Sequence, residues 1–132
     1  MAEELDDETP AFAHRMFELA RSGHADALSE FVDAGLPVDL TNDKGDTLLI
    51  LATYHDHPAT VRALPDRGAD TARVNDGGQT AVGAAVFRRS RAGVEALLQV
   101  GADPGLGSPS AIEIARFFEL PEMLAQLGAA SG

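Results

Sequence analysis

The sequence predicts an all-α fold, a solenoid of four helix-pair repeats joined by short β-hairpin-like fingers. The first observation is a period. The segment 42–47 (Asn-Asp-Lys-Gly-Asp-Thr) returns as 75–80 (Asn-Asp-Gly-Gly-Gln-Thr), and Gly-Ala-Asp at 68–70 returns at 101–103, each time 33 positions later. The second is that each copy places apolar residues at helical spacing between turn residues. A fixed period near this value marks a stacked array, in which each unit covers the apolar face of its neighbour.

The composition narrows the classes of function. The chain has 132 residues, no Cys and a formal net charge of −11. Without Cys there is no disulfide, thiolate nucleophile or Cys-ligated zinc. An acidic chain is poorly suited to the phosphates of DNA and RNA or to anionic membranes. The first residues are acidic rather than basic and apolar, and no apolar run is long enough to span a bilayer. We therefore expect a cytoplasmic protein that binds neither nucleic acid nor membrane.

The chain is predicted to divide into an acidic N-terminal tail, residues 1–8, a single repeat domain, residues 9–128, and a C-terminal tail, residues 129–132. The repeats span about 9–41, 42–74, 75–107 and 108–128. Thr9-Pro10 predicts the start of the first helix, because Thr favours the cap position and Pro the first helical position. We expect part of the acidic tail before it to be mobile, as chain ends often are.

In the first unit, one helix is predicted over residues 11–21 and a second over about 25–34, which Gly35 terminates. The residues expected on their apolar faces are Phe12, Met16, Leu19, Ala20, Leu28, Phe31 and Val32.

The second and third units share one plan. Thr47 and Thr80 are predicted to cap short inner helices that end near Tyr54 and Phe87, and a glycine ends each outer helix. Gly83 inside its helix costs about 1 kcal/mol relative to Ala. The residues expected to face the core are Leu49, Leu51, Ala52, Val61, Leu64, Val82, Val94, Leu97 and Leu98.

Three further residues of the second unit carry specific expectations. Asp56 lies in the turn between the helices, where Asp tolerates a positive φ better than most residues do. Pro58 suits the first position of the outer helix. Pro65 should end or kink that helix early, because it lacks a backbone donor.

The fourth unit is shorter than the others. Ser110 follows Thr80 by three positions fewer than the period requires, so the finger before it is reduced to residues 104–109. Pro121 then opens the last helix. The expected apolar residues are Ile112, Ile114, Ala115, Met123, Leu124 and Leu127. A shortened, atypical unit is expected of a repeat that caps an array.

These residues together resemble the ankyrin repeat. Gly-x-Thr, an apolar stretch ending in Ala, a turn, Val-x-x-Leu and Gly-Ala-Asp occur twice in phase, at residues 45–70 and 78–103. Degenerate copies at residues 20–35 and 110–124 complete the four units. The family's Thr-Pro-Leu-His reads Thr-Leu-Leu-Ile at 47–50 and Thr-Ala-Val-Gly at 80–83. The resemblance implies that the hydrogen bonds this His usually makes between repeats are replaced or lost.

In ankyrin-like arrays the inner helices and finger tips line a concave groove used for binding, so the resemblance implies a site there. Tyr54, Phe87 and Phe117 hold equivalent positions just before the turns and are predicted to form an aromatic stripe. The other interpretation is that each ring covers its own helix, and that the finger residues only make turns. The candidate partner-binding residues are Tyr54, His55, Phe87, Arg88, Phe117, Phe118, Asp43, Lys44, Asp46, Asp76 and Gln79.

Two charged clusters have a simpler interpretation as well. His55-Asp56-His57 is a weak metal motif, because a site needs three or four convergent ligands. His24 and His57 also align with a structural His of the repeat, so we expect no metal and no cofactor. Arg88, Arg89 and Arg91 form a basic cluster in an acidic protein. A solvated turn is the favoured interpretation, and an acidic partner or the chain's own tail is the alternative.

No catalytic motif is present: there is no Gly-x-Ser-x-Gly, no phosphate loop and no His-Glu-x-x-His. We therefore predict a non-enzymatic module that binds a protein partner through the concave groove. The alternative is a small-molecule binder or atypical enzyme, with an apolar pocket near Ile50 and Gly83 and with His55 or Asp56 as acid or base. A permanent structural partner of another protein is a third possibility. The sequence does not identify the partner.

Overall fold

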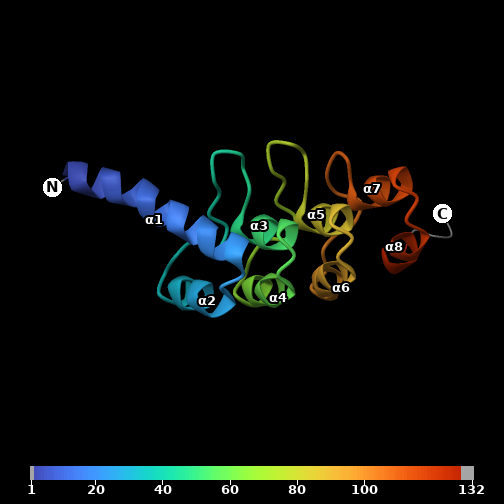
Figure 1. The fold of residues 1–132 in the computed structure, drawn as a ribbon, viewed down its shortest axis with the longest axis horizontal. Coiled ribbons are helices and arrows are strands. Elements are labelled where there is room, and N and C mark those ends of the chain that lie inside the picture. Colours follow the sequence, from blue (N-terminus) through green and yellow to red (C-terminus); the bar gives the residue numbers. More distant parts are fainter. Residues whose placement is uncertain (1, 129–132) are drawn as a thin grey trace.

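Eight helices arranged in four antiparallel pairs make up the computed structural model, which describes the backbone of residues 2–128 and the side chains of residues 11–128. The inner helices are α1 (Ala2–Ser22), α3 (Leu48–Tyr54), α5 (Ala81–Phe87) and α7 (Ala111–Phe117). The outer helices are α2 (Ala25–Asp33), α4 (Pro58–Asp66), α6 (Arg91–Gln99) and α8 (Pro121–Gln126). Each inner helix packs against the next inner helix, and each outer helix against the next outer helix. Figure 1 shows these two rows, with the fingers projecting beyond the inner row.

The array is an all-α solenoid, as the sequence predicts. The described residues contain no β-strand, and the fingers carry only the isolated bridges Thr41–Thr47 and Gly107–Ser110. No helix in this part of the chain is long and apolar enough to cross a membrane.

Hydroxyl side chains cap the inner helices α3, α5 and α7. The Oγ1 atoms of Thr47 and Thr80 accept hydrogen bonds from the N–H groups of Ile50 and Gly83, at 3.0 and 3.1 Å. Both predicted caps are therefore confirmed. Ser110 does the same for α7, and the Glu113 side chain completes a capping box by accepting from the Ser110 N–H at 2.9 Å. These bonds satisfy donors that the helix itself leaves free.

The core lies between the two rows of helices. Every residue of α3 except Tyr54, and every residue of α5 except Phe87, is buried. A helix that is apolar on all sides is a buried helix, and these two are enclosed by neighbours in both rows. The outer helices bury one stripe each, centred on Leu28, Val61, Leu64, Val94, Leu97 and Met123.

Two expectations about helix ends are wrong. The first helix begins at Ala2, not at Thr9-Pro10. The acidic residues before Pro10 favour a helix start there, because carboxylates stabilise the N-terminal turns, and Pro10 removes a single backbone bond. Pro65 also does not end α4 early, because α4 and α6 both have 9 residues; the expected kink stays a prediction. Pro65 is the penultimate residue of α4, so the one i→i−4 bond that it cannot donate lies in the last turn.

The division of the chain at residue 8 stays a prediction, and residues 129–132 lie outside the part that the structure describes.

The turns between paired helices use a left-handed residue at one equivalent position of each unit. The expected positive φ of Asp56 is confirmed at 59°. Gly23, Arg89 and Glu119 hold the same position, and for the two charged residues φ is 57° and 54°. Left-handed backbone at a residue other than Gly, Asn or Asp is uncommon, so these turns are held by their surroundings.

Hydrogen bonds at the turns join neighbouring units. His57 Nε2 donates to the Arg21 carbonyl at 2.7 Å, and Ser90 Oγ donates to the Asp56 carboxylate at 2.7 Å. These bonds connect the first unit to the second and the second to the third. They provide polar links between repeats in a chain that lacks the family's usual His near the inner-helix start.

Candidate binding groove

Aromatic side chains at the ends of α3, α5 and α7 form a continuous row. The ring centroids of Tyr54 and Phe87 are 6.0 Å apart in a stacked arrangement. The Phe87 ring is 6.1 Å from that of Phe118, which in turn is 4.9 Å from Phe117. The exposed fractions of Tyr54, Phe87 and Phe118 are 38%, 38% and 39%, so the rings are open to a partner along the row.

The predicted stripe named Phe117 as the third ring, and here the structure differs. Phe118, the cap residue that follows α7, contacts Phe87, whereas Phe117 lies one ring further on with an exposed fraction of 79%. We call Tyr54, Phe87, Phe118 and Phe117, in that order, the aromatic row.

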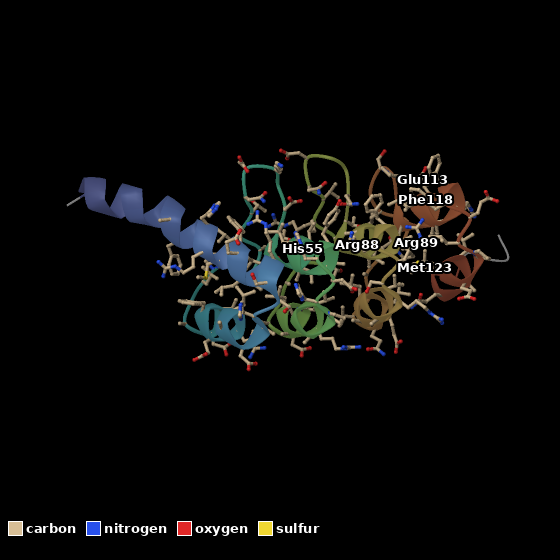
Figure 2. All side chains as sticks on the ribbon, in the orientation of Figure 1. His55, Arg88, Arg89, Glu113, Phe118 and Met123 are labelled. Carbon is tan, nitrogen blue, oxygen red and sulfur yellow. The ribbon has the colours of Figure 1, made fainter. Side chains whose placement is uncertain are left out.

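Two guanidinium groups lie over the rings of this row. The Arg88 Cζ atom is 5.8 Å from the centroid of the Tyr54 ring, and the Arg89 Cζ atom is 5.0 Å from that of Phe118. A guanidinium at this distance is attracted to the negative face of an aromatic ring. Figure 2 labels both arginines between His55 and Phe118.

His55 lies beside the first ring of the row, with its ring centroid 5.8 Å from that of Tyr54. Desolvation of the imidazole is the largest cause that lowers the pKa of His55 below 6.5, followed by the positive charges of Arg21, His57 and Arg88. Glu18 acts in the opposite direction. The neutral imidazole is therefore favoured.

The fingers form the opposite wall of the groove. Asn42 Oδ1 accepts hydrogen bonds from the N–H groups of Lys44 and Asp46, both at 2.9 Å, and closes the first finger. Asn75 Oδ1 closes the second finger in the same way, through the N–H groups of Gly77 and Gln79. Each finger tip is thus fixed by one side chain, as expected for Asn in a turn.

Hydrogen bonds also connect one finger to the next. The Asp76 N–H donates to the Lys44 carbonyl at 2.9 Å, and Asn75 Nδ2 donates to Asp46 Oδ1 at 2.8 Å. The Ser108 N–H donates to the Gly78 carbonyl at 2.8 Å, which links the shortened third finger to the second. The fingers therefore make a continuous wall. Among the predicted finger residues, Asp46 serves this wall directly through its carboxylate.

Two cavities lie between the finger wall and the inner helices. The first has a volume of about 500 Å³ and is mostly polar; the second, of about 480 Å³, is mostly apolar. The predicted residues in the first are Asp43, Lys44, Asp46, Tyr54, His55 and Gln79, and those in the second are Gln79, Phe87, Phe117 and Phe118. Arg88 and Asp76 line neither. The remaining predicted residues thus line two cavities that share Gln79, and we call the two together the groove.

The candidate residues did not include Arg21, Asn42, Leu51, Asn75, Pro109, Glu113 and Ile114, which also line these cavities. Arg21 could have been found, because it precedes Tyr54 by one period of 33 positions. Glu113 could have been found as the fourth residue of the capping box that begins at Ser110. Pro109 and Ile114 carry no local signal of their own.

The apolar pocket proposed around Ile50 and Gly83 is not formed. Ile50 lines the first cavity with His55, but only 2% of its surface is exposed, and Gly83 and Asp56 do not line that cavity. A Cβ atom at Gly83 would lie 3.6 Å from the Ile114 side chain, so the space beside Gly83 is filled by α7. The Asp56 carboxylate accepts a hydrogen bond from the Ser90 hydroxyl. The structure does not bring these four residues together.

Among the described residues, no group of three or more His, Asp or Glu side chains is placed to hold a metal ion. Within the predicted motif, His57 is bound to the Arg21 carbonyl and Asp56 to the Ser90 hydroxyl.

Comparisons with known proteins agree with this geometry. A family model described as ankyrin repeats, in three copies, matches residues 16–107. An ankyrin repeat protein of Pseudomonas aeruginosa is 52% identical over 59 residues, which are 45% of this chain and 34% of the relative. The crystal structure of the human ASB11 ankyrin repeat domain superposes with a TM-score of 0.76 at 28% identity, over 89% of this chain and 54% of that one. The chain thus spans about a third of the curated relative and about half of the solved domain.

Proposed function

The chain belongs to the ankyrin repeat family, and from this premise we propose that its concave groove binds a protein partner without catalysis. Ankyrin repeats are a general protein–protein interaction fold. The proposal adds where on this chain the partner binds: along the aromatic row, against the finger wall. The cytoplasmic location stays a prediction.

The aromatic row is the observation that supports the proposal most directly. Four rings in succession are exposed in a groove whose floor and wall are otherwise well packed. Large aromatic side chains contribute most to protein interfaces when a partner covers them. The finger wall gives such a partner a polar rim with fixed geometry, since its tips are closed by Asn42 and Asn75.

The test removes two rings of the row and leaves the fold intact. The variant Tyr54→Ala with Phe87→Ala is compared with the control Val74→Ala with Val100→Ala, which removes two exposed apolar side chains that line neither cavity. Both proteins are used to capture partners from cells that produce the native chain. The affinity for the captured partner is expected to fall more than about tenfold for the ring variant only, because each aromatic anchor contributes roughly 1–2 kcal/mol.

Equal affinity of the ring variant and the native chain would refute binding through the aromatic row. Far-UV circular dichroism of all three proteins checks that the helices are retained, so that lost binding is not lost folding.

A further inference from the structure

Two guanidinium groups lie over the aromatic row without a described carboxylate within 4.0 Å. Among residues 11–128, cation–carboxylate contacts within 4.0 Å involve Arg21, Arg67, Arg73 and Arg91, and neither Arg88 nor Arg89 has one. Pairing would be easy to achieve in this chain, which has 21 acidic residues against 10 Lys and Arg. Among residues 11–128, Arg15, Lys44, Arg62 and Arg116 also lack such a contact, so Arg88 and Arg89 are distinguished by being adjacent and by lying over the aromatic row.

The rings hold these guanidinium groups while leaving most of their N–H donors free. A ring face attracts the planar cation, but it does not occupy two N–H donors of the guanidinium as a bidentate carboxylate does. Arg89 makes one long hydrogen bond, from Nη1 to the Phe87 carbonyl at 3.4 Å. Both arginines can therefore still bind a carboxylate in the bidentate geometry that Arg favours.

Near the first ring of the row, the charges of Arg21 and Arg88 act on His55 and, after desolvation, help to lower its pKa. The cavities themselves carry both signs: Arg21, Lys44, Asp43 and Asp46 line the first, and Glu113 lines the second. The excess of positive charge therefore lies at Arg88 and Arg89, over the aromatic row, and not on the floor of the groove.

The chain's own acidic N-terminal segment does not fill this place. Residues 2–10 continue α1 as one helix, and Figure 1 shows that helix extending away from the array, at the end opposite α7. The alternation of rings and guanidinium groups remains open to another molecule.

We propose that the occupant of the groove is an acidic segment of a partner protein, whose carboxylates bind Arg88 and Arg89 and whose apolar side chains cover the aromatic row. This inference rests on the proposed function and specifies the chemistry of the partner. Most of this acidic surface repels such a segment, so the two arginines over the aromatic row direct it to one place.

The test uses a random peptide display library selected on the native chain, followed by affinity measurements on synthetic copies of the selected peptides. Three variants are compared: Arg88→Gln with Arg89→Gln, Tyr54→Ala with Phe87→Ala, and the control Arg62→Gln with Arg73→Gln. The control removes two positive charges from α4 and the loop after it, away from both cavities. Its net charge equals that of the Arg88 and Arg89 variant.

Selected peptides are expected to combine Asp or Glu with neighbouring aromatic or aliphatic residues. Their affinity is expected to fall at least about tenfold in the Arg88 and Arg89 variant and to be unchanged in the control, and to weaken as salt is raised, because exposed charges are screened. Binding of such a peptide should also raise the pKa of His55, followed by NMR, since it adds negative charge nearby.

The other outcomes separate the two proposals. Peptides whose binding requires Tyr54 and Phe87 but not the arginines would overturn the inference of an acidic partner and leave the proposed binding groove standing. Selected peptides enriched in Lys and Arg would have the same consequence. Peptides indifferent to both variants, or no selected peptides, would overturn the groove itself and this inference with it. Tighter binding of a twenty-nucleotide oligo(dT) than of any peptide would also overturn the inference, since it would identify the groove as a nucleic-acid site.

Discussion

Gly78 is the position where the structure makes the sharpest prediction about the finger wall. Its φ is +81°, and a Cβ atom there would lie 2.3 Å from the Ser108 carbonyl oxygen. Its own carbonyl accepts the Ser108 N–H at 2.8 Å. A Gly78→Ala substitution therefore has two effects: it strains the backbone at residue 78, and it displaces the third finger.

The magnitude follows from these two effects. Left-handed backbone at Ala costs about 1–2 kcal/mol, and the loss of one backbone hydrogen bond adds about 1 kcal/mol. The third finger must also move by about 1 Å to restore normal contact distances. We expect the free energy of unfolding to fall by about 2–4 kcal/mol, a large part of the 5–15 kcal/mol typical of a domain.

Gly101→Ala is the matched control. Gly101 has a similar φ of +87°, but a Cβ atom there would meet nothing within 4 Å. It should show the backbone strain alone, about 1–2 kcal/mol, so the difference between the variants reports the contact between fingers. Urea unfolding followed by far-UV circular dichroism measures both, because the chain has no Trp.

Hydrogen exchange at the Ser108 amide gives a second readout. Its protection should be lost in Gly78→Ala and kept in Gly101→Ala. If the two variants unfold at the same urea concentration and both keep this protection, the finger contact does not stabilise the array and the reasoning is refuted.

Three further predictions concern the caps, the turns and His55. Thr80→Ala should lower the free energy of unfolding by about 1 kcal/mol through loss of the α5 cap, and Thr80→Ser should restore it; urea unfolding that does not distinguish the two would contradict the cap. Ser90→Ala removes both the α6 cap and the bond to Asp56, so we expect the free energy of unfolding to fall by about 1–3 kcal/mol; a smaller fall in a background that already carries Asp56→Ala would show that the pair is coupled, and an equal fall would exclude coupling. Arg88→Gln should raise the pKa of His55, measured by NMR, and an unchanged or lower value would contradict the local electrostatics. Because this pKa is lower in the folded chain than its ordinary 6.5, His55 stabilises the fold less as the pH falls below that value, and the variant should reduce this dependence.

The features that the sequence predicts well are those set within a few residues. Thr47 and Thr80 act on amides three positions away, and the glycines that end the outer helices act on the adjacent turn. The repeat then multiplies such local signals, because one unit specifies where the next one packs. The aromatic row was largely visible for the same reason, since Tyr54 and Phe87 differ by one period.

The features that the sequence does not show depend on contacts between units. Phe117 ends α7 as Phe87 ends α5, but the ring of the next residue, Phe118, contacts Phe87, and spacing alone does not show which of two neighbouring rings does so. The hydrogen bond from Asn75 to Asp46 joins side chains 29 positions apart, and no local sequence pattern predicts it. The cavity beside Gly83 is absent because Ile114 comes from the next repeat.

The left-handed conformation of Arg89 has a consequence for how this surface can evolve. Glycine at this position would relieve about 1–2 kcal/mol of strain and lose about 0.5–1 kcal/mol to chain entropy, a net gain in stability of up to about 1.5 kcal/mol. The same replacement would remove one of the two guanidinium groups that lie over the aromatic row. If the proposed partner is correct, selection for stability and selection for binding oppose each other at this residue. A laboratory screen for thermal stability alone would then be expected to enrich Arg89→Gly, and the selected variants would be more stable but would bind the partner with lower affinity.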